Sequence, residues 1–216
     1  MNFLAHAHLS GKNKELLVGN LIADAVKGNQ ITSYPEMVAQ GILLHRQIDT
    51  FTDSHPIVAR SKNTIRAQAG RYSGVVVDIY YDHFLARMWD HFSKIPLDQF
   101  TTSAYKVLGD HSDLLPARVK RMLPYMIAQN WLNGYANLEE LKRIFYGMDR
   151  RTKLVSGMRW AVDTLEEHYN SLNDDFENFY PELITFTNDA RKKIISSKAY
   201  ISSRVPEVFS DCQNHE

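Results

Sequence analysis

Apolar residues recur along most of this chain at three- and four-residue intervals, the spacing of one face of an α-helix. The pattern predicts helices over residues 16–26, from Pro35 to a break at 53–56, and over 58–68, 75–89, 96–108, 116–134, 138–148, 158–172 and 174–196. The run 75–89 is the most apolar, and its three consecutive valines would equally suit the start of a strand. Other strand signals are few, because no Asn-Gly or Asp-Gly turn joins two alternating runs. The sequence therefore predicts an all-α fold with short connections.

These helices are expected to form a compact, single-domain bundle over residues 1–196. Pro181 lies inside the last helix and predicts a boundary or a kink there. Residues 197–216 are polar and rich in serine, which predicts a loosely ordered C-terminal tail. A chain of 216 residues can bury a core without cross-links, and its single cysteine, Cys212, allows no internal disulfide.

Charge and hydropathy exclude several kinds of partner. Lys+Arg and Asp+Glu balance at 25 each, so the chain has no global field for nucleic acid or an anionic membrane. No stretch approaches the ~20 apolar residues of a membrane span, and the N-terminus lacks the basic and apolar regions of a signal peptide. We therefore expect a cytoplasmic protein that binds neither nucleic acid nor membrane. The sequence does not indicate an oligomeric state.

Candidate chemistry lies in His and Asp residues spaced four apart. His45, Asp49 and Asp53 follow one stripe of a predicted helix, and Asp78 and Asp82 repeat the spacing in the most apolar helix. Carboxylates in such a run are costly unless a cation or an arginine compensates them. Several such pairs on different helices are typical of a helical metal site. The alternative is a buried Arg–Asp network that fixes helix packing.

Two further segments carry similar residues. Asn20 and Asp24 are four apart on an otherwise apolar face. His6 and His8 are two apart, so a helix would point them in different directions and only an extended segment would align them. Imidazole and carboxylate ligands together suit Mn²⁺, Zn²⁺ or Fe²⁺ better than Ca²⁺. The chain has no Walker loop, no GxGxxG and no GxSxG motif, so metal chemistry is favoured.

Four segments carry a resemblance to a known family: MNFLAHAHLS, GNLIADAVKGN, GILLHRQIDTFTDSHP and VVVDIYYDHFLARMW. They resemble the bacterial acyl carrier protein phosphodiesterases, and the likeness extends more loosely through IAQNWLNGY, GMDRR and LEEHYNSLNDDFENFYPEL. The resemblance implies an HD-domain-like helical enzyme that uses a divalent metal, most commonly Mn²⁺, with Mg²⁺, Fe²⁺ and Zn²⁺ as alternatives. It implies hydrolysis of the phosphodiester that joins 4′-phosphopantetheine to holo acyl carrier protein. The sequence departs from HD enzymes in having no His-Asp dipeptide; Asp82-His83 and Asp90-His91 have the reverse order.

Carried over by position, the resemblance implies roles for individual residues. The expected metal ligands are His6, Asp24, His45, Asp78 and Asp82, and the expected catalytic residues are Arg46, Asp49 and His83. An acidic carrier protein also needs basic contacts, and the stretch that directly follows the predicted ligand helix supplies Arg60, Lys62 and Arg66 as the expected ones. Two other functions fit the same residues. One is an HD-like phosphohydrolase of a nucleotide or other small phosphoester, and the other is a non-catalytic helical protein that binds carrier proteins.

Overall fold

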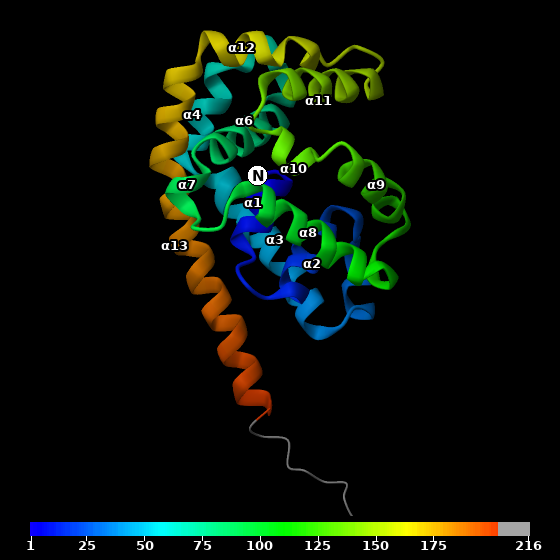
Figure 1. Ribbon diagram of the computed structural model, residues 1–216. Coiled ribbons are helices and arrows are strands. Elements are labelled where there is room, and N and C mark those ends of the chain that lie inside the picture. Colours follow the sequence, from blue (N-terminus) through cyan, green and yellow to red (C-terminus); the bar gives the residue numbers. More distant parts are fainter. Residues whose placement is uncertain (203–216) are drawn as a thin grey trace, which may run out of the picture.

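A computed structural model describes residues 1–202, which contain thirteen α-helices, several short 3₁₀ turns and no β-strand (Figure 1). The all-α prediction is confirmed. The α-helices are α1 (Phe3–Leu9), α2 (Lys14–Ile22), α3 (Glu36–Ser54), α4 (Pro56–Thr64), α5 (Arg66–Ala69), α6 (Ser73–Arg87), α7 (Trp89–Phe92), α8 (Leu97–Asp110), α9 (Ala117–Ala128), α10 (Trp131–Gly134), α11 (Leu138–Arg151), α12 (Ala161–Glu167) and α13 (Tyr169–Ser202). Among these described residues, no helix is both long and apolar enough to cross a membrane.

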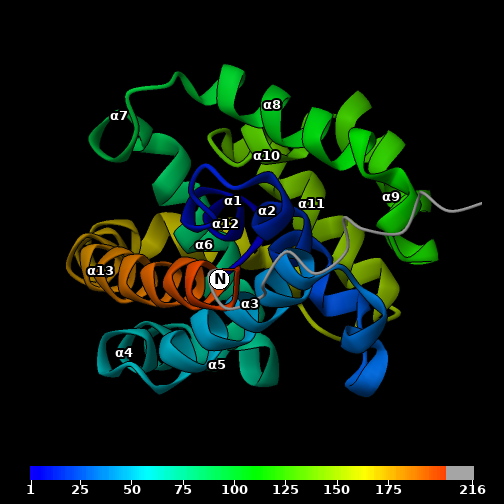
Figure 2. The same ribbon diagram turned by 90° about the horizontal axis from the view of Figure 1, so that it is seen from below.

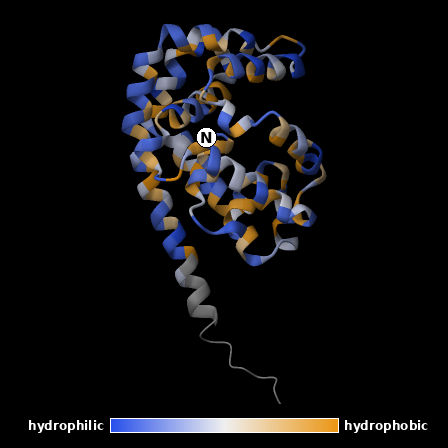
Figure 3. Cartoon of the chain, in the orientation of Figure 1, coloured by the Kyte–Doolittle hydropathy of each residue, from blue (hydrophilic) through white to orange (hydrophobic). Residues whose placement is uncertain are grey.

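The short helix α1 lies in the middle of the bundle (Figures 1 and 2). The long helix α13 runs along one side, and α9 and α11 lie on the other. Polar and apolar residues alternate along the helices, as packing around a shared core requires (Figure 3). The N-terminal segment is therefore surrounded by helices from distant parts of the chain.

Helix α6 is buried along most of its length. Its side chains from Val76 to Ala86 are almost all buried, including the large rings of Tyr80, Tyr81 and Phe84. The Tyr81 and Phe84 rings contact Phe176 of α13. A strand at the three valines is therefore excluded, and the length of the apolar run reflects burial of the helix on most of its faces.

Helices α2 and α3 cross at two glycines. A Cβ atom at Gly19 would lie 2.0 Å from the carbonyl oxygen of Val38, and one at Gly41 would lie 2.4 Å from that of Leu16. The two backbones can approach this closely only because neither residue has a side chain. The crossing brings the C-terminal half of α2 against the middle of α3, where His45 lies.

Several predicted helix boundaries are wrong. The helix expected over 116–134 is broken at Asn130, whose left-handed backbone (φ 45°) separates α9 from α10. The helix expected over 16–26 ends at Ile22, and a 3₁₀ turn (Ala23–Ala25) follows. Left-handed residues other than glycine are uncommon, so the periodicity of the flanking residues could not reveal the break at Asn130.

The C-terminal helix also differs from the expectation. It begins at Tyr169 and continues through Pro181, so there is no boundary at that proline. The backbone stays helical past the expected domain limit at residue 196, to Ser202. The remainder of the predicted tail, 203–216, lies outside the described residues.

Candidate metal site and adjoining pocket

Three side chains from two helices converge at the centre of the bundle. His6 comes from α1, and His45 and Asp49 come from consecutive turns of α3. The two oxygens of Asp49 divide between the histidines: Oδ1 lies 3.2 Å from His6 Nε2, and Oδ2 lies 3.1 Å from His45 Nε2. The imidazole rings stack with their centroids 3.9 Å apart, and one donor atom from each residue lies within 4.8 Å of the others. We call these three residues the triad.

Helix α2 determines which nitrogen of each histidine faces Asp49. His6 Nδ1 lies 2.7 Å from the side-chain oxygen of Asn20, and His45 Nδ1 lies 2.8 Å from the backbone oxygen of the same residue. Both oxygens accept hydrogen bonds, so both Nδ1 atoms donate. In a neutral imidazole the other nitrogen, Nε2, then carries a lone pair. Partners of this kind commonly fix the tautomer of metal-binding histidines.

The triad contains an unsatisfied acceptor. His6 is only 2% exposed, and its Nε2 makes no hydrogen bond even though Asp49 lies beside it. Two lone pairs and an ionised carboxylate therefore face one another, an arrangement that requires a proton or a cation. Two imidazoles and one carboxylate form a donor set suited to Mn²⁺, Fe²⁺ or Zn²⁺. The residues present therefore fit a divalent transition metal.

Burial and the neighbouring charged groups together set the pKa values of the triad. Burial lowers the pKa of His6, and the neighbouring His45 lowers it further, to about 4. Burial also acts to lower the pKa of His45, but Asp24 and Asp49 outweigh it and raise the pKa to about 9. Burial raises the pKa of the Asp49 carboxyl, but the two histidines outweigh this and leave it well below its usual range. Without a metal, a proton on His45 supplies the positive charge at neutral pH.

Asp24 lies at the outer edge of the triad. Its carboxylate is 75% exposed, and Oδ1 is 3.3 Å from His45 Nε2. The hydrogen bond from His45 lowers its pKa, so the group is ionised at neutral pH. Because α2 ends at Ile22, Asp24 stands in the 3₁₀ turn and faces solvent instead of the apolar helix face that its spacing from Asn20 predicts.

Two other predicted ligands, Asp82 and Asp78, contact nitrogen atoms of the N-terminal segment. Asp82 is fully buried and accepts hydrogen bonds from the backbone N–H groups of Leu4 (2.7 Å) and Ala5 (3.1 Å), which begin helix α1. Burial raises its pKa to about 7 despite these bonds. Asp78 Oδ1 lies 3.1 Å from the amino group of Met1, which is also 3.6 Å from Asp49 Oδ1. Both aspartates thus hold the segment that carries His6.

The two remaining predicted catalytic residues, His83 and Arg46, have hydrogen-bond partners outside the triad. His83 is buried, and its ring nitrogens contact the Tyr135 carbonyl oxygen (2.8 Å) and the Tyr169 hydroxyl (3.1 Å). Arg46 is exposed, and its Nη2 donates to the carbonyl oxygen of Val26 at 3.4 Å. Within the part of the chain that the structure describes, neither side chain forms a hydrogen bond or an ion pair with the triad.

The predicted carrier-protein contacts lie on α4 and α5. Arg60 forms an ion pair with the buried carboxylate of Asp175 on α13, and Lys62 lies 2.7 Å from Asp53. Arg66 is exposed. Two of the three cations therefore already neutralise carboxylates of this chain.

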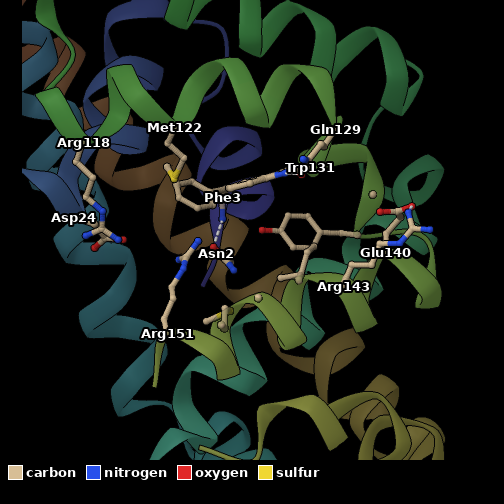
Figure 4. Close-up of a pocket in the computed structure, with 15 residues that line it drawn as sticks. Asn2, Phe3, Asp24, Arg118, Met122, Gln129, Trp131, Glu140, Arg143 and Arg151 are labelled. Atoms are coloured by element: carbon tan, nitrogen blue, oxygen red, sulfur yellow. Dashed lines mark hydrogen bonds and ion pairs between the residues drawn. The ribbon is translucent and has the colours of Figure 1, made fainter. Parts of the chain in front are cut away.

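A pocket of about 640 Å³ opens beside the triad between α1, α9, α10 and α11 (Figure 4). Asp24 belongs to its wall, and no member of the triad does. Three arginines also line it, together with a half-buried apolar surface that includes Phe3, Met122 and Trp131. The volume is within the range of about 300–1,000 Å³ usual for small-molecule sites.

Sequence reasoning did not find most of this pocket. Arg118 and Arg151 stand in basic stretches of the sequence, but nothing in their spacing indicates that they face the same cavity. Trp131 reaches the wall only because the chain turns at Asn130. The supporting role of Asn20 was also hidden, since its four-residue spacing to Asp24 shows nothing about neighbouring helices.

The family model and the relatives that match this chain carry the same description. The family model described as acyl carrier protein phosphodiesterase matches residues 1–183. Proteins named acyl carrier protein phosphodiesterase from Yersinia pestis and Enterobacter sp. (strain 638) are each 35% identical over 185 residues, which cover 85% of this chain and 96% of theirs. The protein of that name from Salmonella agona (strain SL483) is 34% identical over the same shares. No protein of solved structure matches the chain.

Proposed function

The chain belongs to the acyl carrier protein phosphodiesterase family, and on that premise we propose that a divalent metal held by His6, His45 and Asp49 serves its hydrolysis of holo acyl carrier protein. The reaction releases 4′-phosphopantetheine and leaves the apo carrier protein with a free serine hydroxyl. The observation that supports a metal most directly is the buried Nε2 atom of His6, which lacks a hydrogen bond while facing a carboxylate.

The protein prepares this site before any ion arrives. Asn20 directs the Nε2 lone pairs of both histidines toward Asp49. Asp82 fixes the first turn of α1, which sets the position of His6. A divalent ion bound there would polarise the phosphodiester and lower the pKa of a nearby water. Of the metals that suit these donors, Mn²⁺, Fe²⁺ and Zn²⁺, we propose Mn²⁺ because it is the one that the family resemblance implies most commonly.

Asp24 is suited to handle the attacking water. It is ionised at neutral pH, borders the triad through His45 and belongs to the wall of the pocket. A carboxylate in that position accepts a hydrogen bond from water and orients its oxygen toward a phosphoryl group held in the pocket. We therefore propose that Asp24 positions the water, while the triad holds the metal.

The test is incubation of the purified protein with holo acyl carrier protein, with and without added Mn²⁺, followed by intact-mass analysis. We expect metal-dependent loss of one phosphopantetheine group. Asp49→Asn should lower both metal content and turnover, whereas Asp24→Asn should retain the metal and lose turnover by about 10²-fold or more. Asp53→Asn is the matched control, because Asp53 lies one turn further along α3 and is exposed.

Different outcomes would contradict different parts of the proposal: the substrate, the metal or the role of Asp24. Metal binding without cleavage of the carrier protein would favour a phosphohydrolase with another small substrate. Cleavage that persists in Asp49→Asn and in metal-free protein would overturn the metal assignment. Loss of metal in Asp24→Asn would make Asp24 a ligand instead of the residue that positions water.

A further inference from the structure

The pocket beside the triad differs in character from one end to the other. Figure 4 shows Asp24 and Arg118 at one end, with Arg151 nearby, and Glu140 and Arg143 at the other. Phe3, Met122 and Trp131 lie between these ends. One end is therefore rich in cations beside the proposed water-positioning carboxylate, and the middle offers apolar side chains.

The arginines of the two ends are not equivalent. Arg143 forms an ion pair with Glu140 at 2.5 Å. Arg118 and Arg151 are exposed, and within residues 1–202 neither forms an ion pair with a carboxylate of this chain. A guanidinium with unused donors is suited to bidentate binding of phosphoryl oxygens. The end that contains Asp24 thus has available positive charge next to the triad.

The middle of the pocket matches a long ligand with little charge. The Phe3, Met122 and Trp131 side chains are each partly buried, and they form an apolar surface in the wall of the pocket. The side chains of Asn2 and Gln129 add polar groups to the same wall. Pantetheine has a dimethyl group, methylene segments and two amides along its length, which require this mixture of apolar contact and hydrogen bonding.

We propose that this pocket binds the phosphopantetheine arm of the carrier protein, with its phosphate between Arg118, Arg151 and Asp24 and its pantetheine chain along Phe3, Met122 and Trp131. The assignment rests on the proposed function, since the triad must act on the phosphate at the Asp24 end. It names residues for substrate selection that are separate from those that hold the metal. The arm, and not only the body of the carrier protein, then determines what the enzyme accepts.

The experiment measures binding of free 4′-phosphopantetheine by calorimetry and its competitive inhibition of carrier-protein cleavage. Arg118→Met should weaken both by about tenfold or more, because a charge-assisted contact to phosphate is lost. Its control is Arg150→Met, an exposed arginine of α11 that lies outside the pocket wall. Trp131→Ala should weaken binding of 4′-phosphopantetheine several-fold, whereas Tyr125→Ala, an exposed aromatic residue of α9 outside the wall, should leave it unchanged.

Two further measurements distinguish the possible failures. Arg118 is exposed, so its variant should keep the wild-type unfolding temperature, and metal content should stay normal in all four variants. If no carrier protein is cleaved but the wild type binds 4′-phosphopantetheine and Arg118→Met and Trp131→Ala weaken that binding, the proposed function fails while the ligand is still assigned to this pocket. If the wild type cleaves the carrier protein but Arg118→Met and Trp131→Ala bind 4′-phosphopantetheine normally, the pocket assignment is overturned. Equal inhibition by inorganic phosphate and 4′-phosphopantetheine would overturn the role of the apolar wall.

Discussion

At the scale of single residues, Asn20 connects both histidines of the triad to helix α2. Its side-chain oxygen accepts from His6, and its amide nitrogen donates to the His6 carbonyl oxygen (2.9 Å) and to Ser10 Oγ (3.0 Å). Its own carbonyl oxygen accepts from His45. The residue is fully buried, so none of these bonds can be replaced by bulk water. One asparagine thereby fixes the position and tautomer of His6 and contributes to those of His45.

We predict that Asn20→Ala lowers metal affinity and turnover by about 10–100-fold, the usual effect of removing a partner that orients a metal-binding histidine. The backbone contact to His45 remains in this variant, so the loss should come mainly from His6. Stability should fall by about 1–3 kcal/mol because buried polar groups lose their partners. Metal titration, steady-state kinetics and urea unfolding measure the three effects, with Asn29→Ala on the exposed turn as control. Unchanged metal affinity would show that the histidines are oriented without Asn20.

At the scale of helices, the close crossing of α2 and α3 determines whether Asn20 can reach His45. We predict that Gly19→Ala destabilises the protein by about 1–3 kcal/mol, because the new methyl group must displace the Val38 carbonyl oxygen and separate the helices. Gly109→Ala is the matched control. Gly109 lies in the last turn of α8, and nothing in residues 1–202 packs within 4 Å of the position that its Cβ would take, so the change should stabilise the helix by at most about 0.5–1 kcal/mol.

Denaturant unfolding of both glycine variants measures the difference. The displacement in Gly19→Ala should also lower metal affinity, since the His45 Nδ1 contact spans the two helices. If Gly19→Ala proved as stable as Gly109→Ala, the close approach of the two backbones would be refuted.

The spacing of residues within single helices determined how much of the site could be predicted from the sequence. A four-residue spacing is a local property of a helix, so the pairing of His45 with Asp49 on one face followed from the sequence alone. Asp78 and Asp82 have the same spacing, but they contact the N-terminal segment that carries His6. Spacing gives the residues that share a face and does not give the element that the face meets. The approach of His6 depends on the packing of α1 against α2 and α6, which periodicity does not encode.

Helix ends were the weaker part of the fold prediction for a similar reason. The all-helical architecture followed from periodicity summed over many residues. The break at Asn130 depends on one left-handed backbone conformation, and the continuation through Pro181 depends on the packing of α13 along the bundle. These local details matter for function, because the turn at Asn130 brings Trp131 into the pocket wall.

At the scale of the whole molecule, the balanced charge leaves only local basic surfaces to attract an acidic partner. The chain has 25 basic and 25 acidic residues, so attraction of an acidic carrier protein must come from a cluster and not from net charge. Proximity in sequence to the helix that supplies His45 favoured Arg60, Lys62 and Arg66, yet Arg60 and Lys62 already form ion pairs. Basic residues of α9 and α11 instead adjoin the pocket, and Arg118, Arg143 and Arg151 belong to its wall.

We therefore predict that the carrier protein docks against α9 rather than α5. Lys120→Glu combined with Arg121→Glu should raise KM for holo acyl carrier protein by about tenfold at low ionic strength and flatten its salt dependence, because electrostatic attraction is screened within a Debye length of about 10 Å at 0.1 M salt. Both residues lie outside the pocket wall, so inhibition by free 4′-phosphopantetheine should not change. Arg66→Glu on α5 is the exposed control, expected to leave KM near the wild-type value. A salt-dependent rise in KM for Arg66→Glu, with none for the α9 pair, would place the docking surface on α4 and α5 and would require the arm to reach the triad from that side.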